Sequence, residues 1–598
     1  MKAMKTIYKT SVFCAIAWLS LPMATVAQED KSVSREMTLE REYAPSVQDA
    51  NKINTLPDVK VPEVRKSTID YSTFAVPAEP QREIGILPPG SIMTDMSYNN
   101  RRGYLNAGVG TLFHINGDLG YHILSTDKDQ LNVFFTHRST NGNIKFVQDP
   151  IDAKTKAKLN DNLGGINYRH VFSSLAFKIG ANYNYSGFNY YGLSPRYFPS
   201  GNIIPEIKPE NGETFVFEND TNQVNQTIHG FIGVESAADA AVGYLLDIDY
   251  TNFGQKYGSD TSVDGIKEHT ARAVFDLNAS FGGSQKVGLG GKAHYFTYSS
   301  SDWAVGNGFY RELSDNRLIG TLSPYYKAEG DNWNIKLGVN ASFITKEDKK
   351  FVASPNIAMD VTTGGKTTLY LNAGGGPEVN SYYELSRRNR YVLRYETPAT
   401  SRTWLDAVAG VKSGIVPGFW FDIFAGYKMT DDDCFFVYSS DYTGFGNTAT
   451  TVSLDTKRLQ AGASLKYAYQ KLFEIRLKGV YYNWTVADVS IADNVTKEVK
   501  PYGRPEMEIT AGFMICPFDP LKIEADYYLA TGRYTTITNW EPLKMNNINE
   551  LNVKASYALN DTFGFYVMAN NVLFQKYELL YGYPLQRFSV MGGININF

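Results

Sequence analysis

The sequence has few cysteines, little net charge and no long apolar run, and each shortage excludes a class of protein. Only three of its 598 residues are cysteines, so a disulfide-rich scaffold is excluded. The spacing gives no support to a disulfide between Cys434, in a predicted loop, and Cys516, near a predicted strand end, so two free thiols are expected. The net charge of -4 gives no basic surface for nucleic acid. Beyond the N-terminus, no apolar run reaches the length of a transmembrane helix.

Residues typical of catalysis or metal binding are also scarce. The seven histidines are scattered without metal-ligand spacing. His137 and His170 could face each other across a hairpin, but we interpret them as hydrated wall residues. The run 431–433 of aspartates is interpreted as a solvated loop in preference to a calcium site. The glycines 374–376 indicate close backbone approach within a strand, because no helix follows them. We therefore expect no enzyme, no cofactor and no metal site, although a spatial cluster of catalytic residues stays open.

The N-terminus has the three parts of a secretory signal peptide. Lys2, Lys5 and Lys9 supply positive charge, residues 11–21 are apolar, and residues 25–27 form a small-residue cleavage site. The apolar part, which contains Cys14, is too short to span a bilayer. A signal peptide is predicted over 1–27, which directs the chain out of the cytoplasm.

Residues 28–100 differ from the rest of the chain. They are rich in proline and charge and show little periodicity. We expect an extended segment that lies in the periplasm or in the lumen of the following domain, with 101–598 as the folded part.

Alternation of apolar and polar residues dominates the sequence from Gly103 onward. In residues 333–343 one face carries Trp333, Leu337 and Phe343, while the other carries polar residues such as Lys336. Residues 175–185 and 588–598 repeat the pattern. A strand places alternate side chains on opposite faces, so these segments predict strands with one apolar and one polar face.

The lengths of the predicted connections alternate as well. Short turns are predicted at 173–174, 283–284, 331–332, 417–418, 518–520 and 561–562. Long polar loops are predicted near 139–163, 187–226, 299–315, 383–402, 431–455, 484–500 and 533–548. A soluble β-sandwich also alternates, but it has no reason to segregate its loops by length. The pattern therefore favours an all-β transmembrane antiparallel barrel of about 22 strands in an outer membrane, with short periplasmic turns and long external loops.

The polar face is expected to line a wide lumen. Its charged residues carry both signs, so the wall predicts no strong ion selectivity. They include Lys178, Lys336, Glu474, Arg476, Lys478, Lys522, Glu524, Asp526 and Lys554.

The last two hairpins resemble the C-terminus of TonB-dependent outer-membrane receptors. The stretch from Asn570 to Tyr577 and the closing strand that ends in Phe598 carry the resemblance, with Val572 and Gln575 as departures from it. The resemblance implies that Phe598 is a signal for the barrel-assembly machinery. Family members carry a folded plug domain before the barrel, but 28–102 is shorter and lacks the Gly-rich strand pattern of such plugs.

The same resemblance implies a partner of TonB type. Such a partner binds a short extended stretch by strand addition, and Met37, Thr38 and Leu39 have suitable alternation. A plain extended tail is the alternative for these residues, and energised transport depends on which is right.

Two predicted external loops hold the candidate ligand-binding residues. One contains Tyr190, Tyr191 and Tyr197; the other contains the arginines Arg387, Arg388 and Arg390. Aromatic rings stack on sugars or apolar ligands, and guanidinium groups bind carboxylate or phosphate. An interfacial aromatic girdle and contacts to lipopolysaccharide are the alternatives.

Together these patterns predict a receptor or transporter in the outer membrane that binds or imports a nutrient. Its partners would be membrane lipid, lipopolysaccharide and a small-molecule or glycan ligand, with no nucleic acid. The alternative is a non-transporting barrel that scaffolds an envelope complex, with 28–100 as a tether.

Overall fold

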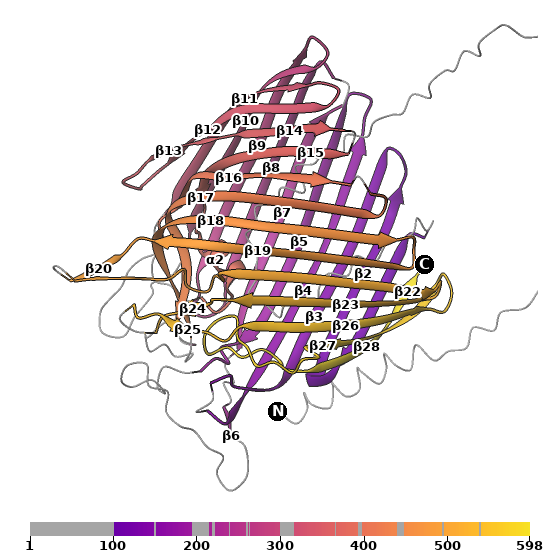
Figure 1. Cartoon of the computed structure of the whole chain (residues 1–598), viewed down its shortest axis with the longest axis vertical. Helices are drawn as coiled ribbons and strands as arrows, with labels where there is room; N and C mark the ends of the chain where they lie inside the picture. The colour runs from indigo at the N-terminus through magenta and orange to yellow at the C-terminus, as the bar shows by residue number, and fades with distance from the viewer. Residues whose placement is uncertain are drawn as a thin grey trace, which may run out of the picture. The chain divides into compact units, whose positions relative to one another are not determined.

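The described part of the chain is a closed antiparallel β-barrel with one short α-helix (Figure 1). The computed structural model describes residues 101–598 except 149–150, 194–214, 218–221, 238–239, 259–260, 262–263, 300–315, 365, 393–397, 415, 439–447, 493–494 and 538–539. Its main sheet has 24 strands. One of them, β6 (Phe215–Phe217), only adds in parallel to β4, and β13 and β14 are two pieces of one strand paired with β12. This leaves 22 barrel strands, which confirms the predicted fold class. The predicted boundaries at residues 27 and 100 lie outside the described residues.

The barrel strands follow one another around the wall in chain order. They are β1 (Gly103–Gly110), β2 (His114–Ser125), β3 (Asp129–Lys145), β4 (Ala153–Val171), β5 (Leu175–Asn189), β7 (Asn222–Ser236), β8 (Val242–Gln255), β9 (Lys267–Phe281), β10 (Gln285–Tyr298), β11 (Arg317–Glu329), β12 (Trp333–Ile344), β13 (Phe351–Pro355), β14 (Ile357–Thr363), β15 (Thr367–Glu378), β16 (Ser401–Ser413), β17 (Phe419–Tyr438), β18 (Ala449–Tyr469), β19 (Phe473–Val486), β22 (Met507–Phe518), β23 (Leu521–Thr531), β26 (Ile548–Ala558), β27 (Phe563–Asn570) and β28 (Ser589–Asn597). The smaller elements are η2 (Thr111–Phe113), α2 (Tyr382–Arg388), β20 (Val489–Ala492), β21 (Val495–Lys497), β24 (Tyr534–Thr535) and β25 (Leu543–Lys544).

The first and last strands close the barrel. β1 pairs with β28 from Tyr104↔Asn597 to Gly110↔Met591, and Gly103 and Phe598 exchange both backbone hydrogen bonds at 2.7 and 2.9 Å. The Phe598 ring also stacks on Tyr121, with centroids 5.9 Å apart. Closure pairs the first and last described strands with each other, which removes the two edges that an open sheet would expose to hydrocarbon.

The outer face of the wall is apolar and the inner face is polar, as the alternation predicts. On β12, Leu337 and Val339 are about half exposed on the outside. The preceding residue, Lys336, turns inward, where its ammonium lies 4.6 Å from the ring centroid of Tyr325. Comparable outward residues recur around the wall: Ile179, Ile232, Ile248, Leu289, Leu322, Ile423, Leu477, Phe513 and Val567. A soluble protein does not expose so continuous an apolar band, so this is the surface that a bilayer covers.

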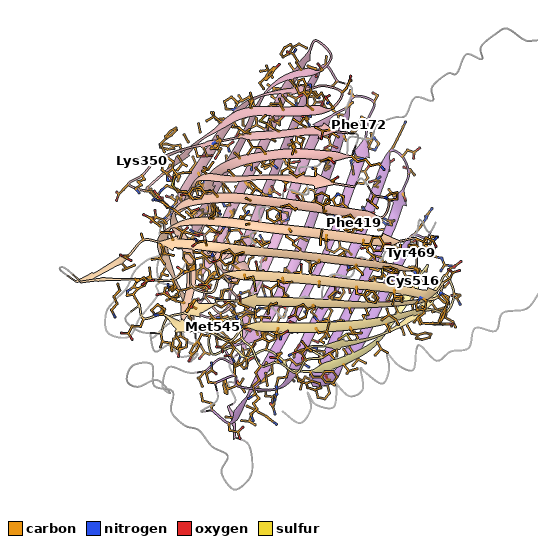
Figure 2. All side chains as sticks on the ribbon, in the orientation of Figure 1. Phe172, Lys350, Phe419, Tyr469, Cys516 and Met545 are labelled. Atoms are coloured by element: carbon orange, nitrogen blue, oxygen red, sulfur yellow. The ribbon has the colours of Figure 1, made fainter. Side chains whose placement is uncertain are left out.

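The two ends of the barrel differ in their connections. All the predicted short turns lie at one end, together with Gly103 and Phe598. The longer connections, which include α2 and the β20–β21 and β24–β25 hairpins, lie at the other end. Figure 2 shows Phe172, Tyr469 and Cys516 at the short-turn end and Lys350 and Met545 at the long-loop end.

Two of the predicted long loops are wrong in extent. β3 continues to Lys145 and β4 begins at Ala153, so most of 139–163 is strand. Likewise β17 continues to Tyr438 and β18 begins at Ala449, so Cys434 lies in a strand and is buried. These strand ends extend past the apolar band, where the outer face no longer meets lipid. Apolar alternation is therefore lost there although the strands continue.

The two cysteines of the barrel are free thiols, as expected. Among the described residues, no helix combines the length and apolarity needed to cross a membrane.

Candidate functional site

The barrel encloses a cavity of 2190 Å³ that is lined from many strands and from the long connections. Eleven arginines and lysines line it against six aspartates and glutamates. The basic residues are Arg101, Arg102, Arg138, Arg272, Arg387, Arg388, Arg390, Arg458, Arg504, Arg533 and Lys554; the acidic residues are Asp118, Asp161, Glu378, Glu384, Glu508 and Glu550. The mixed signs predicted for the wall are present, but the cavity itself has a basic excess. Such an excess raises the local concentration of anions.

One long connection folds into the barrel and covers this cavity at the long-loop end. It consists of residues 379–392, between β15 and β16, and is called the inner loop. Its helix α2 begins at Ser381, whose side chain accepts a hydrogen bond from the Glu384 amide at 3.4 Å. Glu384 lies in the first turn and Arg387 and Arg388 in the last, which is the charge order that the helix dipole favours.

The start of the inner loop is fixed to the ends of β8, β9 and β10. The hydroxyl of the buried Tyr382 lies 3.0 Å from the Gln255 side-chain oxygen, and its amide donates to the Tyr298 hydroxyl at 3.1 Å. The next amide, of Tyr383, donates to the Glu268 carboxylate at 2.8 Å. Leu385 is fully buried in the same apolar cluster. Apolar burial and hydrogen bonds thus hold this part of the loop against one side of the barrel.

The end of the inner loop reaches β4 and β5, which lie nearly opposite β15 and β16 in the strand order. Arg390 makes a two-pronged ion pair with Asp161 of β4, with N–O distances of 3.0 and 2.9 Å. Ser186 of β5 donates to the same carboxylate at 2.6 Å. The two attachments together show that the inner loop crosses the lumen.

Beside this ion pair lies an aromatic cluster of Phe188, Tyr190, Tyr191, Tyr391 and Tyr583. The Tyr391 ring stacks on Tyr583 with centroids 3.8 Å apart and meets Tyr191 edge-on at 5.8 Å. All five side chains are buried. Burial raises the pKa of Tyr191 to about 12 and holds the pKa of Tyr391 and of Tyr583 well above its ordinary value, so the hydroxyls stay neutral. The cluster is an uncharged apolar seal between three connections that are distant in sequence.

The connection 571–588 supplies Tyr583 and a buried acid. Glu578 accepts hydrogen bonds from the Gln148 side chain at 2.9 Å and from the Gly582 amide at 2.8 Å. Burial raises the pKa of Glu578 to about 7, because these bonds and the nearby Arg533 offset only part of the cost of removing a carboxylate from water. Arg533 itself donates to the backbone carbonyls of Glu578 and Leu579 at 2.8 Å each.

The structure brings the two predicted ligand-binding loops together. Tyr190 and Tyr191 are buried in the aromatic cluster, and Arg390 is bound to Asp161 beside it. Arg388 faces the cavity and donates to the Cys434 carbonyl at 3.1 Å, whereas Arg387 is half exposed and pairs with Glu384. Tyr197, Met37, Thr38 and Leu39 lie outside the described residues, and the role of Phe598 in assembly stays a prediction.

Sequence reasoning missed the partners of these residues. Asp161, Glu268 and Tyr583 lie on other strands or connections, and no local motif marks them. The sequence offers one indication for two of them. Glu268 and Asp161 are charged residues within strands, and a charged side chain there needs a partner when it is buried.

The other residues singled out in the sequence have structural roles. Asp433 of the aspartate run pairs with Arg504 at 2.7 Å, and Asp432 pairs with Arg402. The His137 ring is 2.7 Å from Asn162 and the His170 ring 2.6 Å from Asp129, so the two histidines do not face each other. Gly375 has a φ of 154°, and a Cβ there would lie 2.5 Å from the Thr403 carbonyl, which confirms close backbone approach. Within the described ranges no group of His, Cys, Asp and Glu is arranged to hold a metal ion.

The fold is similar to that of several solved structures, among them a siderophore receptor and an iron transporter. The siderophore receptor PirA from Acinetobacter baumannii matches with a TM-score of 0.60 at 10% identity, over 84% of this chain and 81% of that one. The FrpB iron transporter from Neisseria meningitidis gives 0.60 at 10% identity, over 84% and 82%. FpvA from P. aeruginosa, solved with pyoverdines and iron, gives 0.59 at 11%, over 83% and 72%. No family model and no curated protein matches the sequence.

Proposed function

We propose that this protein is an outer-membrane receptor that binds a nutrient in its lumen and imports it, in the manner of TonB-dependent receptors. The observation that carries the proposal is the inner loop, which crosses a 22-strand barrel above a cavity with a basic excess. An open barrel of this width would be a water-filled channel. A loop fixed at both sides of the mouth narrows this channel, and a receptor needs such a closed resting state.

The basic excess and the aromatic lining of the cavity support a ligand with anionic and planar groups. The similar folds of the siderophore receptor PirA and the iron transporter FrpB support iron complexes as one such class. Uptake energised by a TonB-type partner remains part of the proposal, with Met37, Thr38 and Leu39 as the candidate contact.

A growth comparison tests the proposal. A deletion strain is grown on limiting iron, on limiting cobalamin and on glycans as the carbon source, with the wild-type gene restored as the control. Slow growth on one of these media, reversed by the restored gene, is the expected result. Equal growth on every medium, together with a stoichiometric envelope partner that co-purifies with the protein, would favour the scaffold alternative.

The TonB-type partner is tested separately. The full chain is mixed with the C-terminal domain of a TonB protein and captured through that domain. We expect retention of wild type and loss of retention when Leu39 is changed to Pro, because proline removes a backbone donor from strand addition. The matched control is Thr38→Val, which keeps the backbone donor. Equal retention of both variants would remove this contact.

A further inference from the structure

Arg458 is a buried charge on the lumen face of the barrel that forms no ion pair with any described residue. It lies near the middle of β18, is only 4% exposed, and alternates with Leu459, which is 54% exposed on the outer face. Its guanidinium makes no hydrogen bond or ion pair with any described residue, and its Nε is among the buried nitrogen atoms that lack a partner. A buried guanidinium in this state is unfavourable unless something else meets its charge.

The other three buried arginines of the described chain also leave Nε without a partner, but each of them donates from its terminal nitrogens to a described residue. Arg317 and Arg402 share the Glu347 carboxylate at 2.6 and 3.1 Å, and Arg533 donates to three backbone carbonyls. The fold therefore supplies partners to the arginines that hold its loops together. Arg458 is the exception. Of these four arginines, it is the one whose guanidinium contacts aromatic rings and no described hydrogen-bond acceptor.

Two aromatic rings fix the Arg458 side chain in place. Its guanidinium carbon lies 5.5 Å from the ring centroid of Tyr482 and 5.4 Å from that of Trp484, both on β19. Tyr482 is anchored by a hydrogen bond to Glu508 at 3.2 Å, and the Trp484 indole donates to the Pro505 carbonyl at 3.3 Å. Aromatic faces orient a guanidinium without using its N–H donors, so the donors stay available.

Two more arginines adjoin this group on the cavity wall. Arg504 lies 5.3 Å from the same Trp484 ring, and Arg388 of the inner loop shares the Cys434 carbonyl with Arg504. Among the described residues, Arg504 is the one of these three arginines that pairs with a carboxylate, that of Asp433. Arg388, Arg458 and Arg504, called the arginine wall, thus carry more positive charge than the residues around them neutralise.

We propose that the arginine wall binds an oxyanion, a carboxylate or phosphate group of a small solute, with Arg458 as its main donor. A planar guanidinium fork presents two parallel N–H groups, which match the two oxygens of either anion. The rings of Tyr482 and Trp484 set the direction of the fork, and Arg388 links the site to the inner loop. The inference names the substrate class for the proposed function, and its biological use depends on that function.

Direct binding to the full chain in a zwitterionic detergent tests the site. Sodium phosphate and sodium citrate are titrated by calorimetry, with glucose as the neutral probe. We expect phosphate or citrate to bind with a dissociation constant on the order of 1 mM or lower, and glucose not to bind. Binding of phosphate alone would identify a phosphate group as the source, and binding of citrate alone a carboxylate.

The variants separate Arg458 from the general positive charge of the lumen. Arg458→Gln should weaken anion binding by about tenfold or more, the loss expected for a charge-assisted hydrogen bond. The matched control is Arg138→Gln, which removes one positive charge from the same cavity. Arg138 suits this purpose because it is already paired with Asp118 at 2.8 Å. The control variant should leave the affinity within about twofold.

A stability measurement distinguishes binding from a structural role. Arg458→Met keeps the aliphatic stem and removes an uncompensated charge, so the thermal midpoint without anion should not fall. Added citrate or phosphate should raise the midpoint of wild type but not of this variant. The inference is overturned if wild type binds neither anion, if Arg458→Gln binds as well as wild type, or if Arg458→Met lowers the midpoint while anion binding is unchanged. If the deletion strain grows as well as wild type while the purified protein still binds the anion, the transport proposal is wrong and the anion site remains supported.

Discussion

At the scale of single residues, Glu578 links the long-loop end of the barrel to pH. Its pKa of about 7 in the folded loop lies above the 4.5 of the unfolded chain. The folded loop therefore binds more protons between these values, and its stability falls as the pH rises from 4.5 through 7. The loss is about 2–3 kcal/mol when the whole range is crossed.

We expect the Glu578→Gln variant to abolish this dependence. A glutamine oxygen can accept the same bonds from Gln148 and Gly582 without a charge. Hydrogen exchange of the Gly582 amide, corrected for the intrinsic rate, should be faster at pH 8 than at pH 5.5 in wild type and equal in the variant. A wild-type amide with the same corrected protection at both pH values would show that the acid titrates near its ordinary value.

At the same scale, the seam between β1 and β28 depends on a residue without a side chain. Tyr566 of β27 extends over Gly593 and Gly108, and a Cβ at Gly108 would lie 2.1 Å from the Tyr566 hydroxyl oxygen. We expect Gly108→Ala to lower the urea midpoint in lipid vesicles, and a second change, Tyr566→Phe, to restore most of it. The obstructing atom is then absent, and the ring carbon behind it lies at 3.1 Å.

Gly593 provides the contrast for this prediction. A Cβ there would lie 2.3 Å from the same ring but also 2.4 Å from the Ala107 carbonyl oxygen. Tyr566→Phe should therefore not rescue Gly593→Ala. Rescue of both alanine variants, or of neither, would show that the tyrosine hydroxyl does not set the spacing at the seam.

At the scale of elements, the inner loop is held at one side by burial and hydrogen bonds and at the other by an ion pair beside the aromatic cluster that contains Tyr391. The pair of Arg390 and Asp161 is partly exposed, so breaking it should cost about 1–2 kcal/mol and raise the open population roughly tenfold. The Cys434 thiol reports opening, because it is buried in one cluster with Tyr382, Leu385 and Val392. In a Cys516→Ala background, a water-soluble maleimide should label Cys434 about tenfold faster when Arg390 is changed to Gln.

The control for this experiment lies on the same loop. Arg387 is half exposed, and its charge interactions with described residues are those with its helix neighbour Glu384 and the Tyr383 ring, so Arg387→Gln should leave the labelling rate unchanged. Similar rates in all three proteins would mean that the ion pair does not hold the loop closed.

At the scale of the whole molecule, the side of the wall on which a charge is placed should decide its effect. Leu337→Lys puts a charge on the outer face of β12 and should lower the free energy of unfolding in vesicles by about 2–4 kcal/mol. The same change at Asn334, on the inner face of the same strand, should cost less than about 0.5 kcal/mol. Urea titrations followed by tryptophan fluorescence measure both. Equal losses would mean that both faces of the wall meet water.

The sequence alone determined the barrel, its approximate strand number, the short turns and the two solvents of the wall. These follow from contacts between neighbours: a strand alternates its side chains, and each hairpin pairs adjacent segments, so the pattern is legible residue by residue. It failed where that pattern fades, at the outer ends of β3, β4, β17 and β18.

Only the tertiary structure decided how the lumen is closed and where its charge is unbalanced. Arg390 meets an aspartate 229 positions away, and Tyr391 meets aromatic rings from two other connections. No periodic pattern in the sequence marks the partners of Arg390 or of Tyr391. Arg458 reads as an ordinary wall residue in sequence, and only its burial against Tyr482 and Trp484 without an ion pair to any described residue distinguishes it. Alternation shows which solvent a side chain faces, whereas a site depends on which distant side chains share that space.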